Sequence, residues 1–425
     1  MVVHVADTGA TVPCDGGAIA GYHRPVQAGA PATGSHGETP DGATPRRLRI
    51  LLVIKCLGYG GAERLLVDMV ANGDHASFDY EVAFVLDAED GLVPTLTASG
   101  TPVHRLGATG NTDLRWTGRL RRLLVAGTFD VVHFHLPYTA SVGRLVVRTL
   151  PAASRPAIVY TEHSLWDKMA VLVKGLNRAT IGLDQSLIVV SQAAYDALPV
   201  ALQPRARVIV HGVDLSRSDS LIADREDVRA EVRSELDVPD DELLVLTVAN
   251  LRPEKGYDVL LDAARLAADR GLQLRFAAIG RGPLERELAA RHRALGLGEQ
   301  FRFLGERDDV LRLLTGADIF VLPSHQEGLP VTLMEAASVG LPIVATAVGG
   351  VPQVIDDGID GLVIAPGRPV EVVDALERLA ADPDLRSRLG ANVKAKSAMF
   401  DVAAACKEVE DIYRRLARPT TSNST

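Results

Sequence analysis

Two glutamates, Glu327 and Glu335, lie eight residues apart on either side of a turn formed by Gly328, Leu329, Pro330 and Val331. An apolar run ends just before this segment, and a helical pattern begins near Pro330, where proline's missing N–H costs nothing. The free N–H groups at such a helix start could bind an anion such as a diphosphate. Glu335 follows by up to about 8 Å at roughly 1.5 Å per residue, which suits contact with ribose hydroxyls. The alternative is that both glutamates are solvated surface residues.

A basic turn follows the apolar run Leu243–Val248. Its residues Arg252 and Lys255 could neutralise a leaving diphosphate, Arg as a two-pronged fork and Lys as a point charge. A solvated basic loop is the alternative. The later segment 280–284 also follows an apolar run, but Glu285 stands where a dinucleotide fingerprint needs its third glycine, which argues against a Rossmann dehydrogenase.

A glycine-rich turn, Gly58-Tyr59-Gly60-Gly61, joins the apolar run 50–54 to a helix expected from Ala62. Glycines at a strand-to-helix turn let backbone N–H groups approach an anion, so this loop could accommodate a phosphate. A turn that simply needs glycine is the alternative. No Gly-Lys-Ser/Thr occurs in the chain, which excludes a P-loop.

Three histidines could suggest zinc. His133 and His135 alternate at the end of one expected strand, and His163 lies just past the next. No Glu-x-x-His helix or cysteine cluster completes a metal site, so hydrogen-bonding histidines are the favoured interpretation. Asp382-Pro383-Asp384 is typical of a helix start. Metal-independent chemistry without a cofactor is therefore expected.

The elements that must position these residues are apolar strands alternating with amphipathic helices. Such runs indicate two doubly wound parallel sheets, each covered on both faces. Their functional edges are the carboxyl ends of the strands, so we expect Rossmann-like domains that face a cleft. The pattern pauses over His211–Asp214 and a polar stretch at 215–227, and three helices close the chain. The expected strands are 50–54, 80–86, 131–134, 157–160, 187–190, 243–248, 274–279, 301–304, 319–322, 342–345 and 362–364.

Composition limits the remaining possibilities. The chain has 425 residues, 47% of them apolar, and a net charge of -9, which argues against nucleic-acid binding. Residues 1–47 contain no Leu, no Phe and a single Ile, Ile19, so they cannot bury a core and are expected to be a disordered tail, or a non-native leader. Three scattered cysteines and the lack of a long apolar run favour a cytoplasmic protein. A basic amphipathic helix at 115–125 could rest on anionic lipid at the inner face of the plasma membrane, or be an ordinary surface helix.

The order of these motifs resembles the GT-B-fold retaining glycosyltransferases of family 4, the glycosyl transferases group 1 type. The resemblance covers residues from Arg49 to about Leu416 and implies an acceptor-side domain at 48–212, a donor domain at 213–400 and a final segment, 401–425, whose helix crosses back to the first domain. The motifs that carry it are Gly60-Gly61-Ala62-Glu63, Asp130-Val131-Val132-His133-Phe134-His135, Thr161-Glu162-His163, His211-Gly212-Val213-Asp214, Arg252-Pro253-Glu254-Lys255-Gly256, Gly280-Arg281-Gly282-Pro283-Leu284, and Glu327-Gly328-Leu329-Pro330 with Glu335.

The resemblance implies transfer of a sugar from a nucleoside diphosphate, with UDP favoured, to an acceptor hydroxyl with retention. The implied partners are a nucleotide-sugar donor and a glycan or lipid-linked acceptor, as in bacterial exopolysaccharide or glycolipid synthesis. The implied roles are His163 and Glu327 for the reacting sugar; Gly61, Arg252, Lys255, Gly328, Leu329, Pro330 and Val331 for the diphosphate; Glu335 for the ribose; Phe303, Leu304 and Gly305 for the base; and Gly60, Glu63, His133 and His135 for the acceptor or sugar.

Two departures from the family pattern are visible. Ala249-Asn250-Leu251 replaces the usual Gly-Arg-Leu, so Arg252 must supply the guanidinium from two residues later, and His211 replaces an asparagine. Glu327 is the sole obvious carboxylate nucleophile and its implied role is sugar binding, so same-face attack is favoured over double displacement. A nucleotide-sugar epimerase and a catalytically inactive nucleotide-sugar-binding subunit are the alternatives.

Overall fold

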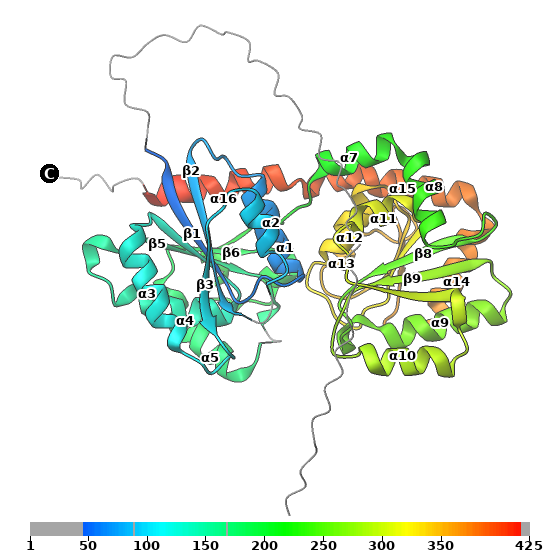
Figure 1. The fold of residues 1–425 in the computed structure, drawn as a ribbon, viewed down its shortest axis with the longest axis horizontal. Helices are drawn as coiled ribbons and strands as arrows, with labels where there is room; N and C mark the ends of the chain where they lie inside the picture. The colour runs from blue at the N-terminus through cyan, green and yellow to red at the C-terminus, as the bar shows by residue number, and fades with distance from the viewer. Residues whose placement is uncertain (1–45, 88–89, 167–168, 418–425) are drawn as a thin grey trace, which may run out of the picture. The chain divides into compact units, whose positions relative to one another are not determined.

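The computed structural model describes residues 46–87, 90–166 and 169–417. The tail expected at 1–47 lies almost wholly outside these residues, as does the polar end of the chain after Ala417. The described part forms two α/β layered domains, each built on a parallel sheet (Figure 1). In this part of the chain no helix has both the length and the apolar character needed to cross a membrane.

The first sheet has the order β3-β2-β1-β4-β5-β6-β7. Its strands are β1 (Leu48–Ile54), β2 (Phe78–Leu86), β3 (Val103–Ala108), β4 (Val131–His135), β5 (Ala157–Glu162), β6 (Ser186–Val189) and β7 (Ala206–Val208). All neighbouring strands pair in parallel, as expected. The apolar runs did not predict β3 or β7, because both are edge strands: β3 has only two buried residues, and β7 has none.

Alternation along β1 divides the first core into two layers. Ile50, Leu52 and Ile54 pack on the side of α1 (Gly61–Ala71), α2 (Val93–Ala98) and α16 (Val402–Ala417). Leu51 and Val53 pack on the side of α3 (Arg115–Gly127), α4 (Pro137–Arg148) and α6 (Gln192–Asp196), and α5 (Val171–Thr180) contacts α4. Every residue from Ile50 to Ile54 is fully buried, which explains the continuous apolar run of this central strand.

The second sheet has the order β10-β9-β8-β11-β12-β13. Its strands are β8 (Leu243–Val248), β9 (Leu274–Ile279), β10 (Phe301–Gly305), β11 (Ile319–Leu322), β12 (Ile343–Thr346) and β13 (Leu362–Ile364). One face packs on α8 (Arg225–Glu235), α11 (Val310–Gly316), α12 (Val331–Ser338) and α13 (Val351–Val354). The other packs on α9 (Tyr257–Asp269), α10 (Glu285–Ala294) and α14 (Pro369–Ala381), and α15 (Pro383–Lys396) contributes to both layers.

The polar stretch 215–227 is not a pause, contrary to the expectation from its composition. It contains α7 (Leu215–Ala223) and the start of α8. Asp214 caps α7, since its side chain accepts hydrogen bonds from the N–H groups of Ser216 and Arg217 at 3.0 and 3.2 Å. By contrast, Asp382 caps α15 as expected, with Pro383 as the first helical residue.

Each sheet reverses its strand order at one place, between β1 and β4 in the first and between β8 and β11 in the second. In open parallel sheets the loops beyond the carboxyl ends of the strands diverge at such a point and leave a crevice. The turns that follow these four strands carry Gly60 and Gly61, Leu136, Lys255 and Glu327. The topology therefore places the glycine-rich turn, the basic turn with Lys255 and the turn with Glu327 at the positions where a crevice is expected.

Candidate active site

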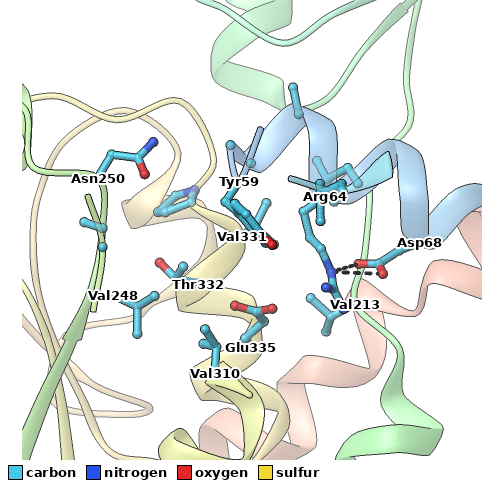
Figure 2. A pocket seen from close by; sticks show the side chains of 18 of the residues that line it. Tyr59, Arg64, Asp68, Val213, Val248, Asn250, Val310, Val331, Thr332 and Glu335 are labelled. Atoms are coloured by element: carbon cyan, nitrogen blue, oxygen red, sulfur yellow. Dashed lines mark hydrogen bonds and ion pairs between the residues drawn. The ribbon is translucent and has the colours of Figure 1, made fainter. Parts of the chain in front are cut away.

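One cavity of about 590 Å³ collects the turns of both sheets. Its volume lies within the range of roughly 300 to 1,000 Å³ that is usual for small-molecule sites. Figure 2 shows part of its lining, with α1 and α12 on opposite sides. The lining includes Tyr59, Gly60, Gly61, Arg64, Asp68, Leu136, His163, Arg217, Asn250, Lys255, Arg281, Glu327, Gly328, Leu329, Pro330, Val331, Thr332 and Glu335.

Lys255 and Glu327 are paired with each other. The Lys255 Nζ lies 2.8 Å from Oε1 and 2.7 Å from Oε2 of Glu327, and Ser324 Oγ donates to Oε1 at 2.6 Å. Glu327 is only 6% exposed, so this carboxylate is held in place by an ammonium and a buried hydroxyl. The ammonium has three N–H donors, and one of them remains for a ligand.

Two helix N-termini meet at the cavity. Helix α12 begins directly after Pro330 and α1 directly after Gly60, and in neither case does a side chain cap the first turn. A Cβ on Gly61 would lie 3.4 Å from a methyl group of Val331, so the two first turns are in close contact. N–H groups without a side-chain cap and the positive ends of two helix dipoles favour an anion at this position.

Glu335 lies further along α12 and faces α1 across the cavity, opposite Arg64 and Asp68 (Figure 2). Arg64 Nε donates to Asp68 at 3.2 Å, an i,i+4 contact on α1. Burial raises the pKa of Glu335 to about 7; the guanidiniums of Arg64 and Arg217 oppose this rise, and the Asp68 carboxylate adds to it. Burial also raises the pKa of Asp68. The acidic groups of Glu335 and Asp68 and the guanidinium groups of Arg64 and Arg217 therefore line the same cavity, where a polar ligand can contact them.

His163 lines the cavity, whereas His133 and His135 lie outside its lining. His133 is fully buried beneath α16, where its Nδ1 lies 2.6 Å from the Tyr413 hydroxyl and its Nε2 lies 2.7 Å from Thr161 Oγ1. His135 is 1% exposed and its Nδ1 lies 3.0 Å from Nε2 of His163. Both residues point into the core because alternate positions of β4 share the face that α16 covers.

Several residues expected near the ligand also lie outside the lining. Arg252 is exposed directly before the 3-10 turn Pro253–Lys255 and lies outside the lining, and Arg281 lines the cavity instead. Phe303 packs against Phe301 and Tyr257. The residues of this segment that line the cavity are those at 306–308, directly after Gly305. The others outside the lining are Leu304, Gly305 and Glu63; Glu63 is buried and accepts a hydrogen bond from the Cys56 thiol.

The sequence patterns did not single out Arg64, Asp68 or Arg217. A signal for the first two was present, because a charged pair at i,i+4 follows soon after the glycine turn, on a helix whose only other charged residue is Glu63. Which face of that helix meets the cavity depends on tertiary packing. Among the described residues, no three or more His, Cys, Asp or Glu side chains are grouped so that they could hold a metal ion.

Comparison with known proteins shows two family models that match consecutive parts of the chain. "Glycosyltransferase Family 4" matches residues 59–217, and "Glycosyl transferases group 1" matches residues 228–396. Together they cover the whole second sheet, the first sheet from β2 onward and every cavity residue described above, while β1 lies before the first match.

Two relatives and one solved structure illustrate the similarity. The alpha-D-kanosaminyltransferase of Streptomyces kanamyceticus is 27% identical over 324 residues, which cover 73% of this chain and 84% of that protein. The D-inositol 3-phosphate glycosyltransferase of Saccharomonospora viridis is 30% identical over 319 residues, or 68% of this chain and 70% of the relative. The crystal structure of Anabaena HepE in complex with UDP and glucose has a TM-score of 0.73 at 21% identity, covering 87% of this chain and 100% of that one, and shows a shared fold.

Proposed function

This chain is a GT-B-fold glycosyltransferase of the glycosyl transferases group 1 family, and from that membership we propose that it moves a sugar from a nucleoside diphosphate to an acceptor hydroxyl with retention at the anomeric carbon. The observation that carries the proposal is the cavity in which Lys255, Glu327 and two uncapped helix N-termini surround one position. UDP is the favoured carrier, supported by the UDP complex of HepE.

The diphosphate would lie at the N-termini of α1 and α12. Backbone N–H groups at Gly61 and Val331, together with the remaining donor of Lys255, supply positive potential there without a metal ion. Arg281 on the neighbouring turn can add a two-pronged contact. Glu335 would then accept hydrogen bonds from the ribose hydroxyls, since it follows the phosphate position along α12.

The geometry bears on the mechanism. A nucleophilic carboxylate must be able to approach the anomeric carbon, but Glu327 is held by Lys255 on both oxygens and by Ser324. Same-face attack avoids this difficulty: the acceptor hydroxyl adds to the anomeric carbon as the diphosphate leaves, and the departing oxygen takes the proton. Lys255 and the helix N-termini would stabilise the developing negative charge.

The acceptor side is proposed to work at a lipid surface, on a glycan or lipid-linked acceptor at the cytoplasmic face of the plasma membrane. Helices α3, α4 and α5 pack side by side in this order and contain no Asp or Glu (Figure 1). Their outward residues combine exposed apolar side chains with basic ones, which suits an anionic bilayer. These residues are Val125 (56% exposed), Leu145 (46%), Val171 (89%), Leu172 (85%), Arg121, Arg122, Arg148 and Arg178.

The reaction is tested by incubating the protein with UDP-, GDP- and ADP-sugars and following thermal unfolding and donor hydrolysis. The proposal expects stabilisation by one nucleotide sugar and slow release of its sugar. An inactive binding subunit would show the first effect without the second, and an epimerase would convert the sugar while it stays attached. Absence of any stabilisation or turnover would overturn the proposal.

The lipid contact is tested by sedimentation with vesicles of phosphatidylglycerol or phosphatidylcholine. The wild type should sediment with the anionic vesicles only, and the double variant Val171→Ser/Leu172→Ser should lose binding. Ile359→Ser is the matched control, because Ile359 is a 60% exposed apolar residue of the second domain. Equal sedimentation of wild type and double variant would contradict the contact.

A further inference from the structure

Four imidazoles form a row from the first-domain core to the cavity. The ring centroids of His133 and His135 are 4.3 Å apart, those of His135 and His163 are 5.3 Å apart, and those of His163 and His211 are 5.6 Å apart. Of these four, only His163 lines the cavity. The role of the histidine behind it, His135, is not explained by contact with a substrate.

His135 and His163 share one hydrogen bond, between Nδ1 of His135 and Nε2 of His163 at 3.0 Å. Burial and the neighbouring imidazoles lower the pKa of both rings well below the ordinary value, so both are neutral. A neutral imidazole has one N–H donor and one bare nitrogen acceptor. One of the two bonded nitrogens therefore carries the hydrogen, and the identity of that atom fixes the tautomer of each ring.

The second nitrogen of His135 decides between the two arrangements. Its Nε2 is buried and contacts no hydrogen-bonding group of the described residues. If that nitrogen carried the hydrogen, a buried N–H would lack an acceptor, which is rarer and more costly than a bare acceptor without a donor. The hydrogen of His135 is accordingly placed on Nδ1, which donates to His163.

We propose that His135 is a positioning residue that holds His163 in its Nδ1–H tautomer. His163 Nε2 is occupied as an acceptor, so the ring nitrogen left for the cavity is an N–H donor. Resting on the proposed function, this donor would bind an oxygen of the transferred sugar. His163 then does not serve as the base for the acceptor hydroxyl, which agrees with proton uptake by the departing diphosphate oxygen.

The backbone around His163 is also fixed. The buried carboxylate of Glu162 accepts a hydrogen bond from the Ser164 N–H at 2.9 Å, and its other oxygen accepts one from the Tyr160 hydroxyl. Ser164, directly after the histidine, is thereby tied to Glu162 at the end of β5, and Glu162 is itself held by Tyr160 of the same strand. With the loop fixed, the remaining freedom is the orientation and tautomer of the ring, and His135 sets both.

The direct test is nitrogen NMR of the full-length protein labelled with ¹⁵N-histidine, without ligand, near pH 7.5. His163 is assigned by comparison with His163→Gln. The proposal expects a protonated Nδ1 and a bare Nε2 on His163 in the wild type. It expects this pattern to be lost in His135→Leu and kept in His135→Asn, whose amide nitrogen stands where Nδ1 stands. His133→Asn is the control, since His133 is bonded to Tyr413 and Thr161 instead.

A kinetic measurement accompanies the spectra, with UDP-glucose hydrolysis as the probe. His135→Leu should lower kcat by about 10-fold to 100-fold with little change in KM, a loss of the size seen when the hydrogen-bond partner that orients a metal-ligating histidine is removed. His135→Asn should recover most of this loss. A protonated Nε2 on His163, or an unchanged spectrum in His135→Leu, would overturn the proposal. If the wild type does not hydrolyse any nucleotide sugar, the proposed function fails, but the spectra still decide the tautomer.

Discussion

Lys255 Nζ lies within 2.8 Å of both carboxylate oxygens of Glu327, so a single ammonium spans a nearly buried carboxylate at the end of the second sheet's central strands. The two residues come from different turns, after β8 and after β11, and these strands pair with each other. The pair therefore depends on the sheet and places a cation and an anion together beside the two helix N-termini.

Replacement of Lys255 by methionine should remove stabilisation of the leaving diphosphate. Loss of one charge-stabilising donor typically lowers kcat by about 100-fold to 1,000-fold, and we expect a loss of this size in donor turnover. Arg291→Met is the matched control. It breaks an exposed ion pair with Asp262, in which the charged atoms are 2.8 Å apart and which does not line the cavity, so its kcat should equal that of the wild type. A Lys255 variant within tenfold of wild-type kcat would contradict this role.

Glu335 should make folding stability depend on pH. Burial raises its pKa from the ordinary 4.5 to about 7, so between these values the folded protein holds a proton that the unfolded chain releases. Stability contributed by this group is consequently lost as pH rises through that window. Glu335→Gln removes the effect, and its melting temperature relative to wild type should be higher at pH 8 than at pH 5. An offset that is constant from pH 5 to pH 8 would refute the assignment.

The same carboxyl group should control donor binding. Ribose hydroxyls donate to an ionised carboxylate more strongly than to a neutral acid, so UDP-glucose affinity of the wild type should increase between pH 6 and pH 8. The Glu335→Gln variant should bind UDP-glucose more weakly and with little pH dependence. Calorimetric titration at both pH values measures the difference, and parallel pH profiles for the two proteins would show that Glu335 does not contact the nucleotide.

Arg144 and Asp184 form a fully buried ion pair in the first domain. Arg144 lies on α4, and Asp184 directly follows the 3-10 turn Ile181–Leu183. Arg144 Nε and Nη2 each lie 2.7 Å from an oxygen of Asp184, and Nη1 donates to Asn177. Arg144→Leu leaves a buried carboxylate without its partner, so the free energy of unfolding should fall by about 3 to 5 kcal/mol.

Urea unfolding measures this change. Breaking the exposed pair Arg291–Asp262 by Arg291→Leu should cost less than about 1 kcal/mol. In addition, the double variant Arg144→Leu/Asp184→Leu should be more stable than Arg144→Leu alone, because it removes the unpaired charge. A single variant as stable as the Arg291 control would contradict the burial argument.

Gly256 is required by the turn that carries Lys255. Its φ is +66°, and a Cβ there would lie 2.0 Å from the carbonyl oxygen of Pro323. Gly271 has a similar φ of +71° but no atom within 4 Å of such a Cβ. Gly271→Ala should therefore cost only the left-handed strain of about 1 to 2 kcal/mol, whereas Gly256→Ala should destabilise more and also lower kcat by moving Lys255. Equal unfolding free energies for the two variants would exclude the proposed clash.

Sequence patterns closely predicted the strands that have continuous apolar runs and missed the two edge strands of the first sheet. Strands β8, β9, β11 and β13 begin and end at the expected residues, because buried parallel strands show continuous apolar runs with sharp ends. The edge strands β3 and β7 lack such runs. Helix α7 was missed because its Ser and Asp residues favour loops in general, and its formation depends on the cap at Asp214.

The site could be predicted as a set of turns but not as a set of contacts. Strand order at the two reversal points brings Gly61, Lys255, Glu327 and Glu335 to one cavity, and His163 reaches it from the turn after β5, the strand next to β4. The sequence cannot tell which of two neighbouring turns directs its guanidinium inward. The N–H of Leu251 donates to the carbonyl of Arg281 at 2.9 Å, so these turns lie side by side, and only the fold shows that Arg281 and not Arg252 lines the cavity.

Helix α16 affects when the first domain can fold during synthesis. Its residues Val409, Ile412 and Tyr413 are buried in the same core as Ile50 and Leu52 of β1, although more than 350 residues separate them along the chain. A nascent first domain emerges from the ribosome well before this helix, with one layer of its core still uncovered. The core of the first domain is therefore completed only after α16 has been synthesised. A ribosome that stalls in the second domain leaves this apolar face uncovered, and chaperones can bind it.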